Sequence, residues 1–219
     1  MLNKIGEGRY GVCFLAKLKG ERVVVKKNKT NFFKRYYEKN KFEPIILSRL
    51  DHKSIPKLID IIDEKSFKGI VIEEKTGYTV EHMLFKQKYS FSKKEIYNIG
   101  KQLIQIINYL HKNNIVHRDI RIPNIIVNEG TVSLIDFGLA RFIDNKIYTR
   151  DIDFSYLGDL LLYLLYSSIE VKEDKKIPWY DELPISNDEK LFLKKLLRLE
   201  EPYKTIEKIE YDFLNLYKI

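Results

Sequence analysis

The hydrophobic pattern of this 219-residue chain changes its period once, close to residue 92. Before that point, short runs rich in β-branched residues alternate with turn residues, as in antiparallel strands. After it, apolar residues recur at spacings of three and four, which places them on one face of a helix. The order of the two patterns predicts an α+β fold with a β-rich first part and a mostly helical second part.

The first part of the chain is expected to form a small sheet. Lys19-Gly20 is a turn signal between two of its runs and predicts a β-hairpin. A helical stretch is expected over residues 31–50, and Pro44 should start or kink that helix because proline suits only a first turn. The five expected strands are residues 2–5, 12–18, 22–26, 59–63 and 69–73.

The second part of the chain is expected to be helical from Ser92 onward. Ser92 and Glu95 match a capping box, in which each side chain accepts a hydrogen bond from the other residue's backbone N–H. Residues 125–128 and 131–135 interrupt the helical pattern as two short strands around a glycine turn. From about residue 151 the pattern is helical again.

Length and composition limit the class of protein. The chain is long enough for one domain with a buried core, and we expect lobes of residues 1–74 and 78–219 joined by a hinge near residues 73–77. Its single cysteine, Cys13, excludes an internal disulfide. We find no signal-peptide pattern and no apolar run close to the roughly 20 residues of a membrane helix. We therefore expect a cytoplasmic protein without membrane contact.

The net charge is +8, and basic residues concentrate from Lys26 to Lys41. Such a run is typical of a solvated helix face. The alternative is a contact surface for nucleic acid or for an acidic partner. Charge alone does not separate these two interpretations.

Three glycines form a G-x-G-x-x-G pattern between two expected strands: Gly6, Gly8 and Gly11. A dinucleotide-binding fold would place a helix after the third glycine, whereas a strand follows here. A glycine turn between strands can cover phosphates, because backbone N–H groups approach closely where no Cβ intervenes. The alternative is an ordinary glycine hairpin.

Lys26, at the end of an expected strand, is either a phosphate ligand or a strand-edge lysine.

Two tripeptides point to phosphoryl transfer. His117-Arg118-Asp119 lies in a loop between the amphipathic helix and a strand, where Asp119 can accept a proton from a substrate hydroxyl. Asn124 can ligate magnesium, and Asp136, which begins Asp136-Phe137-Gly138, can bridge that ion to nucleotide oxygens. Each tripeptide alone is common by chance. Finding both in this order, each beside a strand, is not expected by chance.

With these motifs the chain resembles the eukaryotic-like protein kinase superfamily. The resemblance implies a bilobal kinase fold, ATP and Mg²⁺ (or Mn²⁺) as cofactors, and transfer of the γ-phosphoryl group to a hydroxyl. It implies three catalytic residues: Asp119, Lys26 and Arg121. It implies two metal ligands, Asn124 and Asp136. The nucleotide-binding residues that it implies are Gly6, Gly8, Gly11, Cys13, Val24, Lys26, Glu43, Ile72, Glu73, Lys75 and Ile126.

The same resemblance assigns roles within the nucleotide site. Glu43 is the expected partner of Lys26, with Glu38 as the alternative because Pro44 follows Glu43 directly. Ile72 is expected to be the gatekeeper. The hinge is expected to be Glu73 to Lys75, and the residues expected to enclose adenine are Cys13, Val24 and Ile126.

On the acceptor side, Arg121 stands where serine/threonine kinases commonly have lysine, and either residue could steady the γ-phosphate. Asp153 is expected to brace the loop that carries Asp119.

The chain departs from the family pattern between Gly138 and Asp153, where only residues 139–152 intervene. No Ala-Pro-Glu motif occurs, and Thr205 stands where its arginine partner is usual. The platform that holds a peptide substrate is therefore mostly missing. Three functions remain open: a minimal serine/threonine protein kinase, a small-molecule kinase or ATPase of the same fold, and a nucleotide-sensing or nucleic-acid-binding module.

Overall fold

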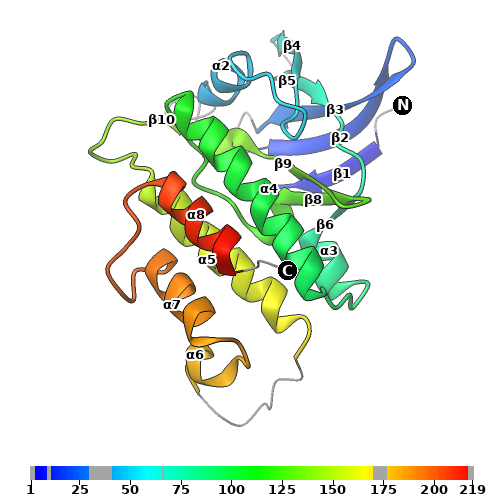
Figure 1. Ribbon diagram of the computed structural model, residues 1–219. Helices are drawn as coiled ribbons and strands as arrows, with labels where there is room; N and C mark the ends of the chain where they lie inside the picture. The colour runs from blue at the N-terminus through cyan, green and yellow to red at the C-terminus, as the bar shows by residue number, and fades with distance from the viewer. Residues whose placement is uncertain (1–2, 9–10, 30–40, 66, 170–176, 217–219) are drawn as a thin grey trace.

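The computed structural model describes residues 3–8, 11–29, 41–65, 67–169 and 177–216. Its first part is a five-stranded antiparallel sheet with the strand order β1-β2-β3-β5-β4 (Figure 1). The strands are β1 (Asn3–Glu7), β2 (Gly11–Leu18), β3 (Glu21–Asn28), β4 (Leu58–Asp63) and β5 (Lys68–Glu73). A mostly helical part follows, so the α+β prediction is confirmed.

The two faces of this sheet carry different side chains. Val23, Val25 and Val71 are buried on one face, where they form a small apolar cluster of their own. Because side chains alternate along a strand, Val24 and Lys26 point to the opposite face. Register pairs Val24 with Ile72 and Lys26 with Cys13, so these four side chains share one face.

The connection from β2 to β3 is the tight hairpin that Lys19-Gly20 predicts. Both residues have a positive φ, 50° and 93°, as a two-residue turn of this kind requires. After β3, the predicted helix over residues 31–50 falls partly outside the described residues. Its described part is helix α2 (Phe42–Leu47), with Pro44 in the first turn.

Helix α4 (Lys93–Lys112) is the long central helix of the second part (Figure 1). The predicted capping box is present: the Glu95 N–H donates to the Ser92 hydroxyl, and the Ser92 N–H donates to the Glu95 carboxylate at 2.9 Å. A cap of this type stabilises a helix by about 1 kcal/mol. Helices α5 (Asp151–Tyr166) and α8 (Ile206–Leu216) pack against α4, α7 (Asn187–Leu196) packs against α5 and α8, and the short helix α6 (Trp179–Glu182) precedes α7.

Several short elements complete the second part. Strands β8 (Ile125–Asn128) and β9 (Thr131–Leu134) form the predicted hairpin. The sequence did not predict α3 (Val80–Phe85) or the two-residue strands β6 (Tyr78–Thr79), β7 (Ile115–Val116) and β10 (Arg141–Phe142). Two-residue strands carry no periodicity, and they form only because tertiary packing brings partners together.

One apolar core joins the two parts. Ile46 and Leu47 of α2 and Ile72 of β5 belong to the same buried cluster as Leu103 and Leu110 of α4. Each fully buried aliphatic side chain contributes about 2 kcal/mol relative to exposure, so this shared core holds α2 and the sheet against the helices. None of the described helices is both long and apolar enough to cross a lipid bilayer.

The connection from the 3-10 turn η2 (Phe137–Leu139) to α5 is short and folded. Strand β10 pairs antiparallel with β7. The Asp144 carboxylate then accepts hydrogen bonds from the backbone N–H groups of Lys146, Ile147 and Tyr148. This turn leads the chain from β10 to the start of α5 within residues 143–150.

Candidate active site

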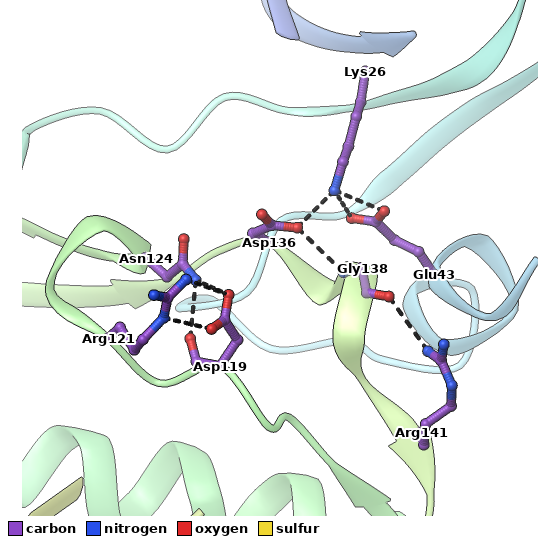
Figure 2. Close-up of polar contacts among 8 residues, drawn as sticks. All are labelled: Lys26, Glu43, Asp119, Arg121, Asn124, Asp136, Gly138 and Arg141. Atoms are coloured by element: carbon purple, nitrogen blue, oxygen red, sulfur yellow. Dashed lines mark hydrogen bonds and ion pairs between the residues drawn. The ribbon is translucent and has the colours of Figure 1, made fainter. Parts of the chain in front are cut away.

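Lys26 on β3 lies between two carboxylates (Figure 2). Its Nζ is 2.9 Å from Glu43 Oε1, 2.8 Å from Glu43 Oε2 and 2.6 Å from Asp136 Oδ1. The Lys26 and Glu43 side chains are only 13% and 8% exposed. The structure thus pairs Lys26 with Glu43, whereas the alternative partner, Glu38, lies outside the described residues.

Pro44 does not displace Glu43, because α2 starts at Phe42 and both residues occupy its first turn. Backbone N–H groups in that turn have no helical acceptor, so a proline there breaks no hydrogen bond. Burial lowers the pKa of Lys26, but the charges of Glu43 and Asp136 outweigh burial and raise that pKa above its ordinary value. Lys26 is therefore a fixed cation near neutral pH.

Asp136 has a left-handed backbone, with φ 62° and ψ 79°. This conformation is uncommon for a residue with a side chain, and its own carboxylate supports it by accepting the Gly138 N–H at 3.2 Å. Burial raises the pKa of Asp136, but the nearby Lys26 ammonium lowers it overall. A Cβ on Gly138 would lie 3.2 Å from Asp136 Oδ1 and 3.4 Å from Lys26 Nζ, so the glycine keeps space for this ion pair.

Asp119 is held by two neighbours on the same loop (Figure 2). Arg121 donates from Nε to Asp119 Oδ1 at 2.5 Å and from Nη2 to Oδ2 at 3.3 Å. Asn124, at the end of η1 (Ile122–Asn124), donates from Nδ2 to Asp119 Oδ2 at 2.8 Å. Both carboxylate oxygens are therefore oriented, while the Asn124 side-chain oxygen accepts no hydrogen bond from any described residue.

Asp153 of α5 is fully buried and braces this loop, as predicted. Its carboxylate accepts the backbone N–H groups of His117 at 3.0 Å and Arg118 at 2.7 Å. Arg118 has a φ of 68°, an otherwise strained conformation for arginine. His111 Nε2 lies 3.0 Å from the same carboxylate. The brace thus fixes the backbone just before Asp119.

The residues expected to enclose adenine come from both sides of the site. Cys13, Val24 and Ile72 lie on one sheet face, and Ile126 lies on β8. Burial raises the pKa of the Cys13 thiol, which keeps it neutral. At the expected hinge, the side chains of Glu73 and Lys75 bind each other at 2.8 Å. Within the described residues, the Lys75 backbone makes no hydrogen bond, so its N–H and C=O remain available.

The glycine pattern forms a turn between β1 and β2. The Gly8 N–H donates to the Gly11 carbonyl at 2.9 Å, while residues 9–10 lie outside the described part. A Cβ on Gly11 would lie 2.6 Å from the Lys27 carbonyl oxygen, which only glycine avoids. Hydrogen bonds from Lys29 and Lys4 lower the pKa of Glu7 to about 2.

The described part of the basic stretch contains side chains with partners inside the protein. Lys26 and Lys29 form ion pairs with Glu43 and Glu7, and Lys27 lies 4.9 Å from the Phe67 ring centroid. Residues 30–40 lie outside the described part. Binding of nucleic acid or an acidic partner there stays a prediction.

A family model described as a protein kinase domain matches residues 1–161. This chain belongs to the protein kinase family. It is 37% identical to a probable serine/threonine-protein kinase, YbdM of Bacillus subtilis (strain 168), over 95% of this chain and 85% of that protein. It is 36% identical to the probable serine/threonine-protein kinase mkcB of Dictyostelium discoideum over 63% of this chain, and 34% identical to cyclin-dependent kinase 12 of Caenorhabditis elegans over 68%. These alignments cover 20% and 23% of the latter two proteins.

The match to the kinase family model ends inside α5, near the point where the sequence departs from the family pattern. Thr205, at the position usual for an arginine, accepts the Lys208 N–H at 3.3 Å at the start of α8. The sequence motifs did not point to Arg141. Arg141 is buried, and it donates to the carbonyls of Gly138 and Ala140. No motif spacing identifies this arginine, because its contacts with these carbonyls depend on how β10 packs.

Proposed function

We propose that this chain is an ATP-dependent serine/threonine protein kinase of reduced size, in which Asp119 accepts the proton of the acceptor hydroxyl. The observation that carries the proposal is the orientation of Asp119. Arg121 and Asn124 hold both of its carboxylate oxygens, yet a carboxylate has lone pairs left for a further donor. A positioned general base of this kind contributes about 10²- to 10⁴-fold to rate.

The nucleotide side of the site fits ATP with magnesium. Asp136 Oδ1 binds Lys26, whereas its second oxygen forms no hydrogen bond or ion pair with another described residue. That oxygen and the Asn124 side-chain oxygen are the donors that Mg²⁺ prefers, and such ions are usually held by one or two protein groups plus phosphate oxygens and water. Magnesium would neutralise charge on the transferred phosphoryl group.

Within this proposal, the remaining residues position the nucleotide. The fixed positive charge of Lys26 binds the α- and β-phosphates, and Glu43 holds that lysine in place. Arg121, which is half-exposed beside Asp119, steadies charge on the γ-phosphate. Catalysis then depends mainly on positioning and charge stabilisation.

Phosphate transfer from labelled ATP to a mixed peptide pool tests this proposal. We expect Asp119→Ala to reduce turnover by about 10³-fold while nucleotide binding persists. We expect Asp136→Ala to reduce turnover at least as far and to weaken magnesium-dependent nucleotide binding. Glu207→Gln is the matched control, because Glu207 is exposed on α8 and has no partner among the described residues. Unchanged turnover in either alanine variant would contradict the mechanism.

A small-molecule acceptor is the second candidate, and the short connection between Gly138 and α5 favours it. The same assay with a panel of hydroxylated metabolites in place of peptides separates the two. Transfer that depends on Asp119 but occurs only with metabolites would replace the protein substrate in our proposal.

A further inference from the structure

Arg141 of β10 is a buried arginine that no step of the proposed phosphoryl transfer uses. It is only 4% exposed, and burying a guanidinium is costly unless its donors are satisfied. Its Nη1 donates to the Gly138 carbonyl at 3.3 Å and to the Ala140 carbonyl at 2.6 Å. Figure 2 shows Gly138 between Arg141 and Asp136. Arg141 therefore holds the turn that carries Asp136.

The same guanidinium also contacts helix α2. Its Cζ lies 4.6 Å from the centroid of the Phe42 ring, a distance at which a guanidinium is attracted to an aromatic face. Phe42 is the first residue of α2, and Glu43 is the second. Arg141 thus contacts both segments that supply a carboxylate to Lys26. One is the turn that follows Asp136, and the other is the start of α2.

A second contact of the same type lies at the other end of α2. Arg49 follows the last turn of the helix, and its Cζ lies 4.6 Å from the centroid of the Phe142 ring. Phe142 is the neighbour of Arg141 on β10, so this short strand contacts both ends of α2. We call the pairs Arg141–Phe42 and Arg49–Phe142 the arginine–aromatic clasp.

Helix α2 needs contacts at its ends because it is short. It has six residues, whereas isolated helices below about 12–15 residues are marginal in water. Ile46 and Leu47 bury one side of it in the shared core, which attaches the helix but leaves its tilt and rotation to other contacts. Because successive residues are spread around a helix, a small rotation would move Glu43 away from Lys26. Attachment at both ends opposes that rotation.

We propose that Arg141 is a positioning residue: through the arginine–aromatic clasp it fixes Asp136 and Glu43 relative to one another, and so sets the carboxylate pair around Lys26. Arg141 acts through these carboxylates and touches no reacting atom. Its consequence for catalysis rests on the proposed kinase function, whereas the clasp itself does not.

The rate at which acetic anhydride acetylates Lys26 tests the clasp without any need for activity. An amine between two carboxylates stays protonated and reacts slowly, because only the neutral amine is a nucleophile. At about pH 9, we expect Lys26 to react about threefold faster in Phe42→Leu and about tenfold faster in Arg141→Met than in the wild-type protein. Peptide mass spectrometry measures the rate relative to Lys204, whose side chain is 81% exposed.

Phe42→Tyr is the conservative variant, because it keeps the ring that the guanidinium stacks on, whereas leucine keeps only apolar bulk. It should acetylate at the wild-type rate. Ile45→Ala is the matched control, since it removes an exposed side chain from the same helix, and it should also keep that rate. Should Arg141→Met fail to fold, the two Phe42 variants decide. Wild-type reactivity of Lys26 in Phe42→Leu, or equal acceleration in the leucine and tyrosine variants, overturns the clasp.

Phosphate transfer provides the second readout. We expect kcat/KM for ATP to fall by the same factors, while KM for the acceptor peptide changes less than about twofold, because the clasp does not contact the Asp119 loop. Equal changes in both substrates' KM values would indicate general destabilisation and contradict a positioning role. Absence of transfer in the wild-type protein contradicts the kinase function, and the acetylation rates still decide the clasp.

Discussion

The two sides of the site differ in how their charges are held. On the nucleotide side, Lys26 and Glu43 are nearly buried and form an ion cluster with Asp136, whose own side chain is 47% exposed. On the acceptor side, Arg121 is 56% exposed and borders a cavity that Glu81 and Asp159 also line. A buried cluster has one low-energy arrangement, because a misplaced charge there is costly. An open surface tolerates change, so we expect nucleotide chemistry to depend on fold stability and acceptor choice to depend on surface charge.

Lys26→Met should produce the largest effect and tests the first half of this comparison. It leaves the buried Glu43 carboxylate without its cation, so we expect a loss of about 3 kcal/mol in the free energy of unfolding. Turnover should fall by at least about 10²-fold, since phosphate positioning is lost. Urea unfolding at neutral pH and labelled-ATP transfer measure the two effects.

The double variant Lys26→Met/Glu43→Gln is the control, because a neutral amide needs no cation. It should regain much of the stability and none of the activity. Equal stability of the single variant and the wild-type protein would show that the cluster is not a structural element.

Asp153→Ala tests whether the acceptor side depends on its buried brace. It leaves the N–H groups of His117 and Arg118 without their acceptor. Each unsatisfied buried group costs about 1–3 kcal/mol, so we expect the free energy of unfolding to fall by about 3 kcal/mol. Turnover should fall at least about tenfold, whereas the Kd for ATP should change less than about threefold. A parallel loss of ATP affinity would show that the two sides are not separable.

Arg121→Ala should act on activity alone. Its side chain is 56% exposed, and Asp119 keeps its hydrogen bond from Asn124 when Arg121 is removed. We expect turnover to fall about tenfold, with the free energy of unfolding changed by less than about 0.5 kcal/mol. Arg121→Lys keeps the charge and should retain more activity than Arg121→Ala. Indistinguishable activity of the two variants would argue against a role in charge stabilisation.

The pH dependence of stability gives the smallest effect and probes the ion cluster. The pKa of Asp136 is lowered in the folded protein, so its favourable contribution is present above the ordinary aspartate pKa of 3.8 and is lost as the pH falls through the folded value. The pKa of Lys26 is raised, so its contribution is complete below its ordinary pKa of 10.5 and is lost only at higher pH. Burial and the Asp136 charge raise the pKa of Glu43, so the stability difference between the wild-type protein and Asp136→Asn should change on the acid side and stay constant from about pH 7 to 9. A midpoint between about pH 7 and 9 would contradict this assignment.

The sequence was most informative where structure depends on neighbouring residues. The Lys19-Gly20 turn, the capping box of Ser92 and Glu95, and the change of period at residue 92 are all local signals, and the structure contains each of them. The two tripeptides around Asp119 and Asp136 are equally local. Their order on loops beside strands was sufficient to recognise the kinase family.

Tertiary structure alone decided how distant residues meet. Lys26 binds Glu43, 17 residues away, and Asp136, 110 residues away. The sequence left both Glu43 and Glu38 open as partners of Lys26. Pro44 is compatible with a helical Glu43 only if the helix begins at that point. The cavity between α3 and α5 was not foreseen, since it is lined by residues from three separate parts of the chain. Local chemistry thus pointed to the candidate site residues, whereas long-range packing determined which of them meet.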